Sequence, residues 1–198
     1  MRTTTNNYKS AIKAPTRTIA AKVELYGSAL EATYTKNDII KSISIERVAE
    51  DSKFFGFGVT HKVNIHLIDV NRTINPTTSN YFKIYLGVKV DGEIEYIPFP
   101  KFYVTEVNRD ENTNELSITA YDKLKDAIGL TVDDLIVEAP YTIKTFIEGC
   151  AAALGLPVVI PESIEVFNTE YATGANFEGT ETIQEALVAA AEATQTIF

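Results

Sequence analysis

Residues 82–97 read FKIYLGVKVDGEIEYI, two runs of alternating apolar and polar side chains joined by Asp91-Gly92. Alternation with a period of two is typical of half-buried β-strands. Asp-Gly between two such runs is the strongest short-range signal for a hairpin, because its type I′ turn needs a positive φ that glycine adopts without strain. This stretch therefore predicts an antiparallel hairpin.

The same alternation recurs on both sides of this hairpin. It is found at residues 18–26, 39–45 and 63–67, and again at residues 102–107 and 116–120, which flank the polar turn 108–114. Strands of this kind joined by short polar turns are typical of all-β domains. Six or more antiparallel strands between residues 18 and 121 predict a barrel or a sandwich.

The hydrophobic period changes after Tyr121. Residues 122–129 predict a short helix that ends at Gly129, the usual residue type at that position. A stronger helix follows Pro140, with an apolar stripe formed by Ile143, Phe146, Ile147, Cys150, Ala151 and Leu154. Thr142 is its predicted N-cap and Gly155 with Pro157 its end, after which residues 157–160 predict a buried strand.

A second helix repeats this design about 40 residues later. Thr182 and Glu185 form a capping-box pattern, and Ile183, Ala186, Leu187, Ala190 and Ala191 form the apolar face. Thr196-Ile197-Phe198 resembles the first half of a further strand, so we expect the natural polypeptide to continue. The predicted class is α+β: a basic arm at residues 1–17, an antiparallel β domain at 18–121 and a small α/β domain at 122–198, which we expect to be truncated at its C-terminus.

The net charge of −9 is unevenly distributed along the chain. Residues 1–23 contain five basic residues and no acidic one, whereas residues 24–198 contain 13 basic and 27 acidic residues. An acidic body repels phosphate groups, which argues against sequence-specific binding of DNA or RNA. The basic arm is interpreted either as a solvated, frayed terminus or as an electrostatic strap onto an acidic neighbour.

No run of residues approaches the length of a membrane span, and the first seven residues lack the apolar segment of a signal peptide. We therefore expect a protein made in the cytoplasm, without a membrane anchor. The single cysteine, Cys150, cannot close an internal disulfide. Its place in an apolar stripe favours a core residue over a nucleophile.

The search for a chemical site yields no convincing group. His61 and His66 are five residues apart in a predicted strand, so their side chains point to opposite faces and cannot share a metal. We interpret both as exposed sheet positions. Asp133-Asp134 is interpreted as a turn or a helix start. We expect no catalytic, no cofactor-binding and no metal-binding residue.

Two further features have plain interpretations. Asn71-Arg72-Thr73 matches a glycosylation sequon, which carries no meaning without secretion. The ten tyrosines and ten phenylalanines could form a sugar-binding surface, but most of them fall on the core phase of the strands, so an aromatic core is expected.

Three stretches carry a resemblance to a known family. Residues 36–48 with 52–58 (KNDIIKSISIERV, SKFFGFG) resemble the opening of prophage tail proteins of Gram-positive bacteria. Residues 102–124 (FYVTEVNRDENTNELSITAYDKL) are the most specific piece, and residues 142–155 and 182–187 resemble the small α/β insertion that follows it. The chain thus resembles the baseplate hub and tail-associated lysin (Tal) family from about Ala14 onward.

The resemblance implies a virion structural protein at the tail tip. Family members are homotrimers in which two tube-like domains per subunit form a pseudo-sixfold ring that continues the tail tube. Expected partners are the distal tail protein and the tape-measure protein, and the expected location is the virion tail, after synthesis in the bacterial host cytoplasm. Any cell-wall hydrolase would lie downstream, so no catalytic residue is transferred. Two alternatives stay open: a cell-surface or carbohydrate-binding β module, and a peptidoglycan hydrolase.

Overall fold

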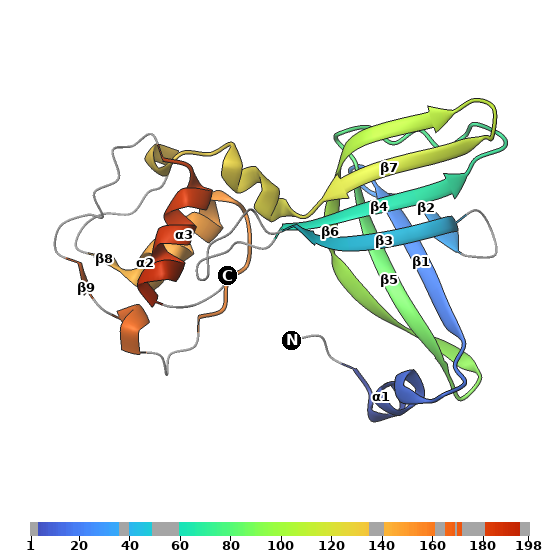
Figure 1. The fold of residues 1–198 in the computed structure, drawn as a ribbon, viewed down its shortest axis with the longest axis horizontal. Coiled ribbons are helices and arrows are strands. Elements are labelled where there is room, and N and C mark those ends of the chain that lie inside the picture. The colour runs from blue at the N-terminus through green and yellow to red at the C-terminus, as the bar shows by residue number, and fades with distance from the viewer. Residues whose placement is uncertain are drawn as a thin grey trace. The chain divides into compact units, whose positions relative to one another are not determined.

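The computed structural model describes residues 4–35, 40–48, 60–134, 141–160, 165–168, 170–171 and 181–194. These residues divide into two compact units (Figure 1). The first lies within residues 1–46 and 61–122, and the second within residues 47–60 and 123–198. Four predicted features fall outside the described residues: the start of the strand at Ile39, the glycines of the segment 52–58, Pro140, and the final segment 196–198.

The first unit is built on one antiparallel sheet with the strand order β2-β1-β5-β6-β7-β4-β3. The elements are helix α1 (Asn6–Lys13) and strands β1 (Ile19–Tyr26), β2 (Leu30–Thr35), β3 (Ile40–Val48), β4 (Thr60–Ile68), β5 (Tyr81–Val90), β6 (Glu93–Asp110) and β7 (Glu115–Tyr121). β2 and β3 are the two edges, so this sheet does not close by a ladder between the strands described here. The predicted barrel or sandwich is therefore a single, open, curved sheet.

One core fills the concave side of this sheet. Its fully buried side chains come from β1, β4, β5, β6 and β7 and include Val23, Ile65, Phe82, Phe102 and Ile118. Tyr34 of β2 and Ile40 of β3 belong to the same cluster, so both edge strands contribute to one core. The alternation predicted from the sequence is thus confirmed for the central strands, whereas Ile19 at the start of β1 is half exposed.

The hairpin that decides the fold forms as expected. Asp91 and Gly92 have φ values of 50° and 98°, as a type I′ turn requires. The two strands predicted after it, at residues 93–97 and 102–107, are one long strand, β6. Its register against β5 shifts between Lys83 and Tyr85, close to Pro98 and Pro100. A bulge tolerates prolines and bends the strand, so β6 continues as one long strand that pairs with both β5 and β7.

The basic arm is helical rather than frayed. Thr5 caps α1 by accepting a hydrogen bond from the Tyr8 N–H, and Tyr8 is the buried residue of the helix. Thr5 also donates to Glu95, and Asn7 donates to Asp91, both on the β5–β6 hairpin. These bonds attach the helix to the first unit, while Lys9 and Lys13 remain exposed.

The second unit contains two short helices that pack on each other. Its elements are 3₁₀ helices η1 (Lys123–Ile128), η2 (Val132–Asp134) and η3 (Glu165–Asn168), helices α2 (Ile143–Ala153) and α3 (Ile183–Thr194), and the short strands β8 (Tyr141–Thr142) and β9 (Glu170–Tyr171). The predicted stripes of α2 and α3 meet in one core with Ala127. Both predicted N-caps form, at Thr142 and Thr182.

Two elements of this unit differ from the prediction, one in its helix type and one in its existence. The segment before Gly129 is a 3₁₀ helix, closed by a bond from the Gly129 N–H to the Asp126 carbonyl. Gly155, which has a positive φ of 64°, ends α2 in a Schellman motif, as predicted. Residues 157–160 form no strand, and Val159 is 92% exposed. The chain leaves that motif at the surface, and Pro157 has no N–H to pair with a neighbouring strand.

No helix in the described part of the chain has the length and apolarity needed to cross a bilayer.

Candidate functional site

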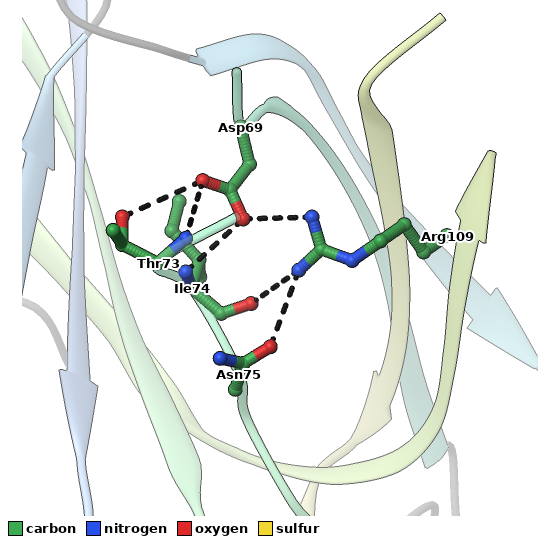
Figure 2. Close-up of polar contacts among 5 residues, drawn as sticks. All are labelled: Asp69, Thr73, Ile74, Asn75 and Arg109. Atoms are coloured by element: carbon green, nitrogen blue, oxygen red, sulfur yellow. Dashed lines mark hydrogen bonds and ion pairs between the residues drawn. The ribbon is translucent and has the colours of Figure 1, made fainter. Parts of the chain in front are cut away.

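The connection between β4 and β5, residues 69–80, is an irregular loop held in one conformation. Asp69 lies at its start and is only 3% exposed. Its carboxylate accepts hydrogen bonds from the backbone N–H groups of Thr73 and Ile74, each at 3.0 Å (Figure 2). Ile74, 4% exposed, is thereby inserted into the core of the sheet.

Arg109, near the end of β6, joins this loop to the sheet. One guanidinium nitrogen donates to Asp69 at 2.8 Å (Figure 2). The other donates to the Ile74 carbonyl at 2.7 Å and to the Asn75 side chain at 3.3 Å. A guanidinium that bridges a carboxylate and a carbonyl orients both rigidly, because its donors form a planar fork. The loop is therefore fixed to β6.

The titration of Asp69 reflects these contacts. Burial by itself would raise its pKa, but the bonds from Arg109 and from the backbone N–H groups of Ile74 and Thr73 outweigh burial and hold the pKa below its usual value. Asp69 is therefore ionised at neutral pH and forms a partly buried ion pair with Arg109, whose side chain is 20% exposed.

The other end of the loop is held by Asn80, which is 7% exposed. Its side-chain oxygen accepts from the Thr77 N–H at 2.7 Å, and its amide nitrogen donates to the Tyr26 carbonyl and to Glu31. Between the two anchors the loop exposes Val70, at 67%, and Arg72, which has a positive φ of 53°. A long loop fixed at both ends is typical of a recognition element.

A second surface lies on the outer side of β1, β5 and β6. We call it the tyrosine–lysine face. It consists of nine residues: Lys22, Glu24, Tyr26, Tyr81, Lys83, Tyr85, Tyr96, Lys101 and Tyr103. The strand register aligns them in rows, with Tyr26 beside Tyr81 and Tyr81 beside Tyr103, and with Glu24 beside Lys83 and Lys83 beside Lys101.

The rings and ammonium groups of this face pack on one another. Tyr26 and Tyr81 are stacked, with ring centroids 5.0 Å apart and planes at 4°. The ammonium groups lie over the rings: that of Lys83 is 4.6 Å from the Tyr26 centroid, and that of Lys101 is 4.8 Å from the Tyr81 centroid. Such cation–π contacts fix the position of otherwise flexible lysine side chains.

Glu24 organises one end of the face. It is 9% exposed and accepts three hydrogen bonds, from Lys22 at 2.8 Å, from the Tyr26 hydroxyl at 2.9 Å and from the Tyr85 hydroxyl at 2.8 Å. Burial opposes its ionisation, but these donors together lower its pKa. Burial and the bond to Glu24 raise the pKa of Tyr85 to about 12. The Lys22 ammonium also lies 4.1 Å from the Tyr85 centroid.

Gly87 allows this packing. A Cβ atom at position 87 would lie 2.5 Å from an Ile94 side-chain carbon and 2.8 Å from a ring carbon of Tyr96, closer than real Cβ contacts. The absent side chain lets the Tyr96 ring approach β5 and meet the edge of Tyr85, at a centroid distance of 6.5 Å. Gly87, a glycine within a strand pattern, is the sequence signal that indicates the close approach of the Tyr96 ring to β5.

The expectation of an aromatic core is wrong for these tyrosines. Phe82 and Phe102 are fully buried, but Tyr26, Tyr81 and Tyr85 lie at alternate positions of β1 and β5, on the opposite side of the sheet. Tyrosine and phenylalanine alternate along β5 and β6, so a pattern that treats both as apolar does not distinguish the two sides of the sheet.

The candidate site residues named in the sequence analysis do not lie together in the structure. His61 lies in phase with buried Val63 and contacts Asp122 at 2.9 Å, whereas His66 lies on the opposite side of β4, 2.9 Å from the Ser117 hydroxyl. Their divergence is thus confirmed. The interpretation of His61 as an exposed sheet position is wrong, because its side chain is 32% exposed and lies on the core side of β4. Cys150 is fully buried between α2 and α3, and Asp133 is exposed in η2.

Residues 71–73, the sequon, belong to the loop pinned by Asp69. No cluster of His, Cys, Asp or Glu able to hold a metal occurs among the residues that the structure describes.

No protein-family model and no curated protein matches the chain. Among solved structures, it is similar to the 43 kDa tail protein of prophage MuSo2 from Shewanella oneidensis, with a TM-score of 0.50 and 14% sequence identity. The match covers 88% of this chain and 50% of that protein, so this chain spans about half the length of the structure it matches. At this identity the similarity is one of fold.

Proposed function

We propose that this chain is a structural component of a phage or prophage tail, and that it acts at the tail tip as a hub or adaptor that continues the tail tube. The observation that carries this proposal is the fold: an open, curved antiparallel sheet followed by a small helical unit, similar over 88% of the chain to a prophage tail protein. The order of the stretches 102–124, 142–155 and 182–187 supports the same role.

In this role the protein acts through its shape. The first unit presents two sheet edges, β2 and β3, which a neighbouring domain can cover, and a rigid loop at residues 69–80. A rigid domain with open edges suits a ring whose subunits complete one another. We propose a homotrimer in which a downstream second tube-like domain fills the alternate positions, with the distal tail protein and the tape-measure protein as partners.

The acidity of the chain suits a channel for DNA. If the acidic surface of this chain, whose net charge is −9, faces the channel of such a ring, it repels the phosphates of a passing duplex and prevents it from adhering. Binding of DNA in a defined sequence is not part of the proposed role.

The assembly state tests this proposal. We expect residues 1–198 to be monomeric at micromolar concentration, because the net negative charge opposes weak self-association, and the full-length protein with its downstream domain to be a trimer. Light scattering after gel filtration measures both masses. A full-length protein that is monomeric, or that forms a two-fold dimer, contradicts the hub.

The tyrosines on the outer side of β1, β5 and β6 bear on the carbohydrate-binding alternative. A sugar ring stacks on an open aromatic face. The ring faces of Tyr26, Tyr81 and Tyr85 are instead occupied by another tyrosine or by an ammonium group of the same chain. This packing favours a protein partner over a saccharide.

The hydrolase alternative has a direct test as well. We expect residues 1–198 to produce no clearing of bacterial cell walls in a zymogram, because His61 and His66 diverge and the Cys150 thiol is fully buried. Lysis that disappears when a single polar residue is replaced would show an active site and overturn the structural role.

A further inference from the structure

We propose that the tyrosine–lysine face is the surface on which a neighbouring copy of the polypeptide docks in the assembled ring, and that the neighbour contributes an acidic surface. This inference rests on the proposed function, since it identifies the partner of the tube-like unit. It is carried by three properties of the face: its order, its charge and its distance from the acidic residues at the C-terminal end of β6.

The face is ordered before any partner binds. Lys22, Lys83 and Lys101 each lie over a tyrosine ring, and the Tyr26–Tyr81 stack joins β1 to β5. Immobilising a long side chain on binding costs about 0.5–1.5 kcal/mol, and contacts within the free chain reduce that cost. Tyrosine is also enriched among the residues that contribute most to protein interfaces.

The charge of the face selects an acidic partner. It carries three lysines and one carboxylate, and that carboxylate, Glu24, is 9% exposed and already accepts hydrogen bonds from Lys22 and Tyr85. The exposed groups are therefore positive, on a chain with 27 acidic and 18 basic residues. Two copies of this face repel each other, whereas the face and the acidic remainder of a second copy attract.

Such a contact joins two different surfaces. Asp110 is exposed at the C-terminal end of β6, at most about 30 Å along the strand from Lys101, and Glu111 is exposed in the turn after it. A contact between the face of one copy and these acidic residues of the next copy is head to tail. Head-to-tail contacts close into rings when the rotation between subunits allows it.

The test uses the full-length protein and charge reversal. We expect Lys83→Glu with Lys101→Glu to raise the dissociation constant of the trimer at least about tenfold, read by light scattering across a dilution series. Lys83→Arg with Lys101→Arg keeps both the charge and the ring contacts and should remain trimeric. Thermal unfolding followed by circular dichroism confirms that each variant is folded.

The matched control is Lys9→Glu with Lys13→Glu, which makes the same charge change on two exposed lysines of α1. This variant should remain trimeric. If the trimer is insensitive to reversal of Lys83 and Lys101, or equally sensitive to the control, the inference fails while the proposed function stands. A monomeric wild-type protein overturns both.

A cross-link identifies the occupant. With p-benzoylphenylalanine at position 101 of the full-length protein, irradiation of induced cells should give an adduct of two copies of the same polypeptide, identified by mass spectrometry. An adduct with a different tail protein or with a saccharide, or the lack of any adduct in a trimeric protein, overturns the assignment of the partner.

Discussion

Asp69→Ala should destabilise the first unit by about 3–5 kcal/mol, the cost typical of removing one partner from a buried ion pair. The substitution leaves the Arg109 guanidinium without its carboxylate and the N–H groups of Thr73 and Ile74 without an acceptor. Ile74 then loses the contacts that hold it in the core. Urea unfolding at neutral pH, followed by circular dichroism, measures the change in the free energy of unfolding.

Asn75→Ala is the matched control, because Asn75 contacts the same guanidinium at 3.3 Å but is exposed. Its effect should stay within about 0.5 kcal/mol, as for most surface substitutions. An Asp69→Ala protein as stable as the wild type would show that the loop is not held by this network.

The ion pair also predicts the response to acid. The folded-state pKa of Asp69 is depressed, so its contribution is complete above the pKa of the unfolded chain, about 3.9, and is lost as the pH falls through the folded value. The difference in unfolding free energy between the wild type and Asp69→Asn should therefore narrow below about pH 4. A difference that stays constant between pH 7 and pH 3 would contradict this account.

Cys150→Asp should unfold the second unit, whereas Cys150→Ala should cost about 1 kcal/mol or less. The thiol is fully buried among Phe146, Ile147 and Leu154, and burial raises its pKa to about 12. A carboxylate at this position would be a buried charge without a partner. Amide hydrogen exchange resolved along the chain should show loss of protection in α2 and α3 for the aspartate variant alone.

The native protein provides the corresponding control for Cys150. A thiol reagent should react with it slowly, at the rate at which the second unit opens, because the sulfur is both covered and protonated at neutral pH. Rapid modification of the folded protein would show that the thiol is accessible and that its assignment to the core is wrong.

Local patterns in the sequence were sufficient to predict the elements that are determined by interactions within a few residues. Asp91-Gly92 specifies its turn through backbone preference. Thr142 and Thr182 cap their helices through bonds to Thr145 and Glu185, each only three residues further along the chain. The apolar stripe that contains Cys150 needed only helical periodicity to be recognised as a core face. β2 was missed, because of its six residues only Tyr34 is buried.

The candidate surfaces depended on contacts between residues far apart in the sequence. Asp69 and Arg109 are 40 positions apart, and nothing in either neighbourhood indicates that the two side chains meet. The tyrosines were expected inside, because a phenol ring counts as apolar in any alternating pattern. Which side of the sheet becomes the core is decided by all strands together, here by Phe82 and Phe102 against Tyr81 and Tyr103.

The sequence by itself determined the α+β class, the central hairpin, the capped helices and the divergence of the two histidines, because each follows from φ preferences, capping bonds or periodicity within a few residues. Only the tertiary structure decided that the sheet stays open, that β6 is one bent strand, and that Lys83 and Lys101 lie over Tyr26 and Tyr81. Those features depend on strand register and bulges, which are set when all seven strands compete to bury side chains in one core.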